Sequence, residues 1–238
     1  MRSYYSNSYM LDGDKLASDT IINFFAENNL MSVPENIYEG FDTYRSYIYE
    51  NYNHGQYYTS VQPEDERLAY AVSKIVKPKS AFIAGSYYGY FAIWLMPHIA
   101  ENNGLCILSD IDQRVCRLAK NNFDKLGYAN NAQIMCEDAV KLLNARKEPL
   151  DFILIDALGS WNDPRPDYRG KQIYIPILKA ACASLTKGST ILMHNVRPRD
   201  FDQRYSMNKN SMLSILKSID AVGICYDSRN GLGVFVVT

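Results

Sequence analysis

One stretch of ten residues decides the fold: residues 81–90, which read AFIAGSYYGY. Four apolar residues lead into two glycines, Gly85 and Gly89. Gly85 allows the chain to turn sharply after a strand, and Gly89 allows backbone and ligand to approach closely where a helix begins. The spacing is not the G-x-G-x-x-G of dinucleotide enzymes, because Tyr87 stands at the second glycine position. The stretch therefore predicts a strand, a ligand-binding turn and a helix.

From this stretch onward, short apolar runs alternate with helix-like segments. Such alternation is typical of a parallel sheet covered by helices on both faces. The turn at 229–231, Arg-Asn-Gly, joins the last two strands as a hairpin. We expect an α/β fold: a Rossmann-like, doubly wound, mostly parallel seven-stranded sheet with a C-terminal antiparallel hairpin strand. The expected strands are 80–84, 105–109, 132–136, 151–155, 190–194, 222–226 and 233–237, and the expected helices are 90–102, 113–126 and 173–185.

The region before the sheet has a different character. Helical patterns cover 20–26 and 65–76, and tyrosines crowd the stretch 44–58 between them. Residues 1–75 are predicted to form an N-terminal helical or lid extension, and 76–238 the Rossmann-like domain, within one structural domain overall. The tyrosines fit amphipathic packing with hydroxyls facing water, which we favour. The alternative is a lid of tyrosine rings over an acceptor.

Composition restricts the classes of partner. The formal net charge is −1, with 47% hydrophobic and 21% charged residues, so no charge excess favours a nucleic-acid polymer or an anionic membrane. No apolar run approaches the roughly 20 residues of a membrane span, and the N-terminus lacks a signal-peptide core. The five cysteines form no C-x-x-C pair, which argues against disulfides and zinc. A cytoplasmic protein is predicted, with a homodimer left open.

Polar residues follow several of the expected strands. In an open parallel sheet the ligand lies beyond the carboxyl ends of the strands, so these side chains should converge. Asp110 could accept hydrogen bonds from both ribose hydroxyls of an adenosine, and Asp138 could accept one from the adenine amine. Asp156 ends an apolar run and should face the cleft, since unpaired burial is costly. The pair His194-Asn195 ends the next strand.

Two of these acids have structural alternatives. Asp110 could be a helix N-terminal acid that interacts with the helix dipole, although Asp112 is better placed for that. Asp138 could be a solvated loop acid. The convergence of all the positions on one cleft is the stronger signal.

At these residues the chain resembles the catechol O-methyltransferase-like branch of the class I S-adenosylmethionine-dependent methyltransferases. The resemblance spans roughly residues 60–238 and is carried by the segments 81–90, 109–112 (SDID), 151–157 (DFILIDA), 185–196 (LTKGSTILMHNV) and 229–234 (RNGLGV). It implies S-adenosylmethionine as cofactor. The positions that it assigns to cofactor binding are Gly85, Tyr87, Gly89, Tyr90, Asp110, Ile111, Asp138, Ala139 and Asp156.

Several positions depart from that family's pattern. The family usually has an acid at the position of Ile83, where it helps hold the methionine part of the cofactor. Its divalent metal is held by an acid like Asp156 and by an Asp-Asn pair, which here reads His194-Asn195. These three residues would be the ligands of any metal, but exchanging a carboxylate for an imidazole moves the site away from Mg²⁺.

Catechol chemistry as such is not expected. The lysine base of the catechol enzymes falls at Gly159, and the carboxylate that grips the catechol falls at Gly233. With Asp156 and Asn195 as the other catalytic candidates, His194 could act as a general base near neutral pH in a metal-free site. It could equally be a histidine whose nitrogens are satisfied by a neighbouring loop.

A long loop follows the fourth expected strand. Trp161, Arg165 and Arg169 could frame an anionic or aromatic acceptor there. They could equally be surface residues. Because loops of this length beside a cleft are commonly functional, we favour acceptor binding.

These observations predict an S-adenosylmethionine-dependent transferase, and specifically a methyltransferase acting on O or N of a small-molecule acceptor, for example in antibiotic tailoring. The alternative is transfer of the 3-amino-3-carboxypropyl group to a peptide- or nucleotide-type natural product, which the loss of the acid at Ile83 would suit. Two other classes are a nicotinamide-dependent oxidoreductase, disfavoured by the glycine pair and the hairpin, and a binding module that has lost catalysis.

Overall fold

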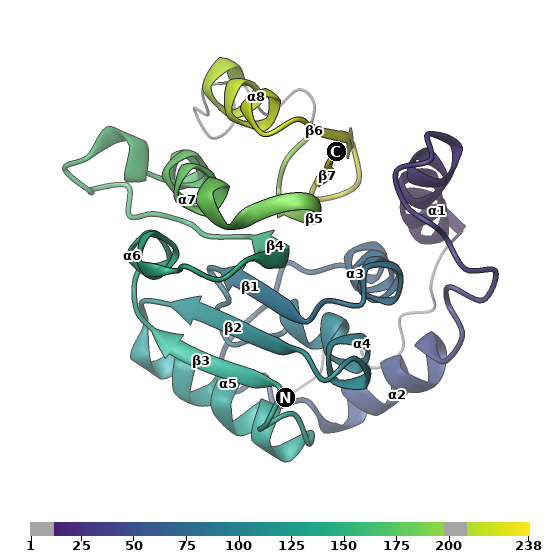
Figure 1. Ribbon diagram of the computed structural model, residues 1–238. Helices are drawn as coiled ribbons and strands as arrows, with labels where there is room; N and C mark the ends of the chain where they lie inside the picture. Colours follow the sequence, from purple (N-terminus) through teal and green to yellow (C-terminus); the bar gives the residue numbers. More distant parts are fainter. Residues whose placement is uncertain (1–11, 198–208) are drawn as a thin grey trace.

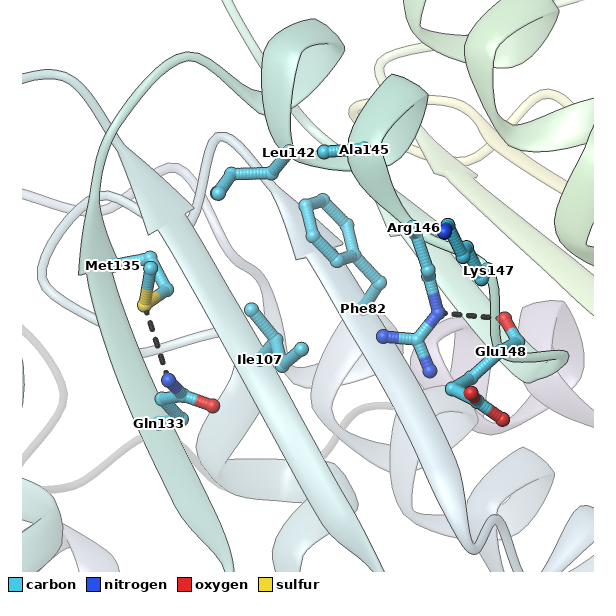
Figure 2. Close-up of a pocket in the computed structure, with 9 residues that line it drawn as sticks. All are labelled: Phe82, Ile107, Gln133, Met135, Leu142, Ala145, Arg146, Lys147 and Glu148. Atoms are coloured by element: carbon cyan, nitrogen blue, oxygen red, sulfur yellow. Dashed lines mark hydrogen bonds between the residues drawn. The ribbon is translucent and has the colours of Figure 1, made fainter.

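The computed structural model describes residues 12–197 and 209–238 and contains all seven predicted strands (Figure 1). The order across the sheet is β3-β2-β1-β4-β5-β7-β6. The first five strands pair in parallel, and β7 runs antiparallel to both of its neighbours. The predicted fold is therefore confirmed. The strands are β1 Ser80–Ala84, β2 Leu105–Asp110, β3 Ala132–Cys136, β4 Leu150–Ile155, β5 Leu185–His194, β6 Ala221–Tyr226 and β7 Leu232–Val237.

Helices cover both faces of this sheet (Figure 1). One apolar cluster joins the odd positions of β1, such as Ile83, to helices α1 to α5, and the other joins Phe82 and Ala84 to α6, α7 and α8. The alternation follows from the period of two along a strand. The helices are α1 Asp12–Glu27, α2 Phe41–Asn51, α3 Pro63–Val76, α4 Met96–Glu101, α5 Gln113–Lys125, α6 Ala139–Ala145, α7 Tyr174–Ala181 and α8 Lys209–Ser218.

The first and last residues of the helices show which local sequence signals were sufficient to predict where a helix begins and ends. The Asp112 side chain accepts from Arg114 N at the start of α5, and Gly127, at φ 86°, follows its end, as expected. The helix expected at 90–102 is instead the 3₁₀ turn Ala92–Leu95 followed by α4, because the glycine turn continues through residue 91. The helix expected at 173–185 ends at Ala181, after which a short 3₁₀ turn leads into a longer β5.

The tyrosines of the N-terminal region pack rather than form an open lid. The hydroxyl of Tyr44 donates to Ile93 O at 2.8 Å, and that of Tyr52 donates to Tyr88 O at 2.6 Å. The hydroxyls of Tyr44, Tyr49 and Tyr52 therefore bond to protein groups instead of water, while Tyr47 and Tyr58 are exposed. The residues of α1 to α3 share the apolar cluster of the sheet, and the division at residue 75 remains a prediction. No helix among 12–197 and 209–238 is long and apolar enough to span a bilayer.

Candidate active site

The glycine turn after β1 is fixed between the ends of β2 and β4. The amides of Gly85 and Ser86 both donate to Ser109 O, at 3.0 and 2.9 Å. Gly85 has φ 78°, and a Cβ built there would lie 2.3 Å from Ala157 Cα. Gly89 has φ 87°. A Cβ built there would lie 2.6 Å from Cε2 of Phe123 on α5, so the absence of a side chain makes room for that ring. Gly89 thus leaves room for α5 to pack against the turn, and close approach of a ligand to its backbone remains a prediction.

Asp110 holds this turn from the end of β2. Its Oδ2 accepts from Tyr87 N at 2.8 Å and its Oδ1 accepts from Asp112 N at 3.0 Å. Burial raises the pKa of Asp110, against the opposing effect of these backbone donors. Asp112, not Asp110, accepts from the amides of α5, so the helix-dipole alternative for Asp110 is not needed. Tyr87 itself is 41% exposed at the edge of the turn.

The adjacent part of the cleft contains exposed apolar side chains. Asp138 caps α6, since its Oδ1 accepts from Val140 N at 2.7 Å, and it borders a pocket of about 500 Å³ that Arg165 and Tyr168 also line. Ile111 is 78% exposed after β2, and Leu158 is 61% exposed after β4. Exposed side chains of this size at the carboxyl edge of the sheet suit contact with a flat ring system.

A chain of four charged side chains lies at the ends of β4 and β5. Lys171 Nζ donates to Asp156 Oδ1 at 3.0 Å, and Asp156 Oδ2 lies 2.9 Å from His194 Nδ1. On its other side, His194 Nε2 lies 3.1 Å from Asp65 Oδ2 on α3. Tyr174 accepts from Lys171 at 2.8 Å and donates to His194 O at 2.7 Å, which closes the arrangement. Three of the four charged residues are almost completely buried: Asp65, Lys171 and His194.

The charged neighbours of His194 and Asp156 determine the pKa of these two side chains. Burial alone would lower the pKa of His194, but Asp156 and Asp65 outweigh it and raise the pKa to about 10. Burial alone would raise the pKa of Asp156, but His194 and Lys171 lower it to about 2. At neutral pH His194 is therefore an imidazolium that lies between the side chains of Asp156 and Asp65.

The hydrogen bonds of both ring nitrogens bear on the two interpretations of His194. Both ring nitrogens face carboxylates and the side chain is fully buried, so no lone pair is available to take a proton from an acceptor. The geometry favours a histidine satisfied by its neighbours over a general base. Its partners are Asp65 on helix α3 and Asp156, which directly follows β4.

The same hydrogen bonds show whether Asp156, His194 and Asn195 could bind a divalent metal. Both oxygens of Asp156 face cations, and neither nitrogen of His194 has a free lone pair. Asn195 follows in the left-handed region, at φ 58°. Within the described parts of the chain no group of three or more His, Cys, Asp or Glu side chains could hold a metal ion. The donor set of Asp156, His194 and Asn195 in this structure therefore does not fit a divalent metal.

Two members of the charged chain were not predicted from the sequence. Lys171 comes from the short 3₁₀ turn Lys171–Ile173 and brings an ammonium group next to Asp156, although the position of the family's lysine is Gly159. Asp65 lies in the run Glu64-Asp65-Glu66, where three acids begin a helix. The only available signal was that these acids stand on a helix whose other residues are largely apolar.

The loop after β4 is braced mostly by its own residues. Arg165 pairs with Asp163 at 3.0 Å and stacks over the ring of Tyr168 at 3.5 Å. Arg169 Nε donates to Asp163 O at 2.6 Å. Trp161 is 58% exposed. A role of this loop in acceptor binding remains a prediction.

Part of the sequence is similar to known methyltransferases. A family model described as a methyltransferase domain matches residues 83–196. A catechol O-methyltransferase from Niastella koreensis is 28% identical over 102 residues, which are 41% of this chain and 46% of that relative. The chain thus spans less than half the length of this curated relative in the aligned part.

Solved structures share the fold over nearly the whole chain. An S-adenosylhomocysteine-bound methyltransferase from Podospora anserina is 14% identical, with TM-score 0.60 and coverage of 98% of this chain and 99% of that one. An O-methyltransferase from Bacillus cereus in complex with S-adenosylhomocysteine is 16% identical, with TM-score 0.56 and coverage of 93% and 100%. TomG from Streptomyces achromogenes, an O-methyltransferase of tomaymycin synthesis in complex with S-adenosylmethionine, is 14% identical, with TM-score 0.58 and coverage of 96% and 100%.

Residues 83–196 therefore match a methyltransferase domain, and a part of the chain is similar to a catechol O-methyltransferase. The family model confirms the prediction of a methyltransferase domain, while the cofactor and the activity of this chain are the subject of the proposal below. The matches named above give no support to the aminocarboxypropyl alternative.

Proposed function

We propose that this chain binds S-adenosylmethionine at the carboxyl edge of its sheet and transfers the methyl group to an oxygen of a small-molecule acceptor. The observation that carries the proposal is the convergence of the Gly85 turn, Asp110 and Asp138 beside the buried pair Asp156–His194. The relatives' activity and ligands support it. A cytoplasmic location, a tailoring role and the absence of nucleic-acid and membrane partners remain predictions from composition and resemblance.

The adenosine part of the cofactor would bind around Asp110. Each Asp110 oxygen accepts one backbone amide and keeps a lone pair for a ribose hydroxyl. Asp138 uses Oδ1 to cap α6, which leaves its other oxygen for an amine donor. Ile111 and Ala139, at the starts of the two neighbouring loops, would contact the base. Tyr87, at the exposed side of the turn, would cover the sulfur end.

The bound cofactor supplies an electrophilic methyl group, and the residues must place an acceptor oxygen in line with it. Lys171 and His194 would act through charge and position, because their protons are held by Asp156, Asp65 and Tyr174. Since His194 is not free to take a proton, the site fits an acceptor that ionises readily, such as a phenol, better than an aliphatic alcohol.

A methyl-transfer assay tests the proposal. The purified protein is incubated with S-adenosylmethionine carrying a labelled methyl group and a panel of phenols, amines and alcohols, and products are read by mass. We expect a gain of one labelled methyl group on a phenolic oxygen, together with S-adenosylhomocysteine. Methylthioadenosine as the by-product would instead indicate transfer of the aminocarboxypropyl group. Binding of the cofactor without turnover on any acceptor would indicate a binding module.

A further inference from the structure

The cofactor's methionine part lacks its usual partner on β1. The acid that the family carries there is replaced by Ile83, which is 1% exposed. The Ile83 side chain belongs to the apolar cluster that also contains residues of α3, so this face of β1 is closed by that helix. Any carboxylate that takes over the role must come from another element on the same face.

Helix α3 begins with three consecutive buried carboxylates: Glu64, Asp65 and Glu66. Two of them have donors that account for their burial. Glu64 accepts from Arg229 N at 2.8 Å, and Glu66 accepts from the hydroxyls of Tyr49 and Tyr90, each at 2.8 Å.

Asp65 is different because only one of its two carboxylate oxygens has hydrogen-bond donors. Its Oδ2 accepts from Gln62 N at 2.7 Å and from Asn230 Nδ2 at 3.3 Å, and it faces His194 Nε2 at 3.1 Å. Its Oδ1 is buried and receives no hydrogen bond from any described residue. The side chain as a whole is 0% exposed. A buried carboxylate oxygen without a donor is costly, and it calls for a donor that the described residues do not supply.

The position of Asp65 fits the methionine part of the cofactor. Through His194 it is connected to Asp156, which ends β4 one position beyond the residue that pairs with Ala84 of β1. Phe91, which follows the glycine turn, places its ring 5.0 Å from the His194 ring. Asp65 therefore lies beside the glycine turn, on the face of the sheet that Ile83 and His194 share.

We propose that Asp65 Oδ1 accepts a hydrogen bond from the α-ammonium group of the cofactor's methionine part and thereby replaces the acid missing at Ile83. This inference rests on the proposed function. An ammonium group supplies the donor that Oδ1 lacks, and the three donors on Oδ2 keep the carboxylate from turning away. Other donors, from the acceptor molecule, are distinguished by the experiment.

The test is calorimetric binding of three ligands that differ in the methionine part. S-Adenosylhomocysteine carries the amino and carboxylate groups, its deaminated analogue keeps only the carboxylate, and methylthioadenosine has neither. The variant Asp65→Asn is isosteric. Because the donors around Oδ2 still need an acceptor, its amide oxygen stays there and its NH₂ group faces the ligand's ammonium. Glu64→Gln, at the preceding position of the same helix, is the matched control.

We expect Asp65→Asn to weaken S-adenosylhomocysteine at least tenfold, which corresponds to about 1.4 kcal/mol. Methylthioadenosine should change less than twofold, and Glu64→Gln should change neither ligand. The wild-type protein should bind the deaminated analogue at least tenfold more weakly than S-adenosylhomocysteine.

Unchanged affinity of Asp65→Asn for S-adenosylhomocysteine, or equal losses for S-adenosylhomocysteine and methylthioadenosine, would overturn the assignment. If Asp65→Asn does not fold, equal affinity of the wild-type protein for S-adenosylhomocysteine and its deaminated analogue overturns it instead. A wild-type protein that binds none of the three ligands would refute the proposed function itself, which is a separate result.

Discussion

The charge on His194 makes the stability of this protein depend on pH above neutrality. The ring is fully buried, with Asp156 at Nδ1, Asp65 at Nε2 and the apolar ring of Phe91 beside it. Burial lowers its pKa, but the two carboxylates prevail and raise the pKa to about 10. A raised pKa contributes stability that is fully present below the unfolded value of about 6.5 and is lost as the pH rises through about 10.

The size of the effect follows from the two pKa values. Between pH 7 and pH 9, a folded pKa of about 10 against an unfolded one of about 6.5 lowers the free energy of unfolding by about 2.5 kcal/mol. Glu66 acts in the same direction, because burial raises its pKa to about 7 and its contribution is lost between about pH 4.5 and 7. Within the window from pH 7 to 9 it adds only about 0.4 kcal/mol.

Urea unfolding at pH 7, 8 and 9 measures this effect. The wild-type free energy of unfolding should fall by at least about 3 kcal/mol, and His194→Gln should make that fall smaller by about 2.5 kcal/mol. The control His98→Gln changes another buried histidine, whose pKa burial lowers, and should keep the wild-type fall. A wild-type protein that is equally stable at pH 7 and 9, or a His194→Gln variant with the full decline, would refute the charged histidine.

Three further outcomes follow from the site. Gly85→Ala should cost at least about 2 kcal/mol more in urea unfolding than Gly127→Ala, because both glycines have positive φ but only the Cβ at Gly85 would overlap backbone; equal costs would refute the close contact with the loop after β4. Lys171→Met should destabilise by about 3 kcal/mol because it removes the cation at Asp156 Oδ1 and leaves only His194 beside this carboxylate, whereas Lys141→Met, which breaks an exposed pair, should leave the urea midpoint unchanged; similar midpoints for the two variants would contradict this. Methyl transfer should be insensitive to EDTA, since the lone pairs of the family's metal position are already bonded; loss of activity that Mg²⁺ restores would contradict the occupied site.

The sheet could be predicted because its signals are local. Each strand is a short apolar run between polar or glycine residues, and the hairpin is marked by Asn230-Gly231. The starts and ends of helices were less certain where neighbouring parts of the fold decide them. Residues 90–91 continue the glycine turn, and the fully buried residues Ala92–Leu95 then form a 3₁₀ turn instead of the first turn of an α-helix.

The candidate site could be predicted only in part. Asp110, Asp138, Asp156 and His194 all stand at strand ends, so the fold alone brings them to one edge. Their partners come from distant segments: His194 bonds to Asp65 across 129 positions of sequence. Whether a histidine is a base or a buried imidazolium depends on such contacts, and no spacing in the sequence encodes them.

Calorimetric titration with S-adenosylhomocysteine tests the central claim most directly, namely that the turn at Gly85 together with Asp110 and Asp138 forms an adenosyl-sulfur binding site. We predict saturable one-to-one binding by the wild-type protein, weakened at least tenfold in Asp110→Ala. No binding to the wild-type protein, or equal affinity of the two proteins, would contradict it.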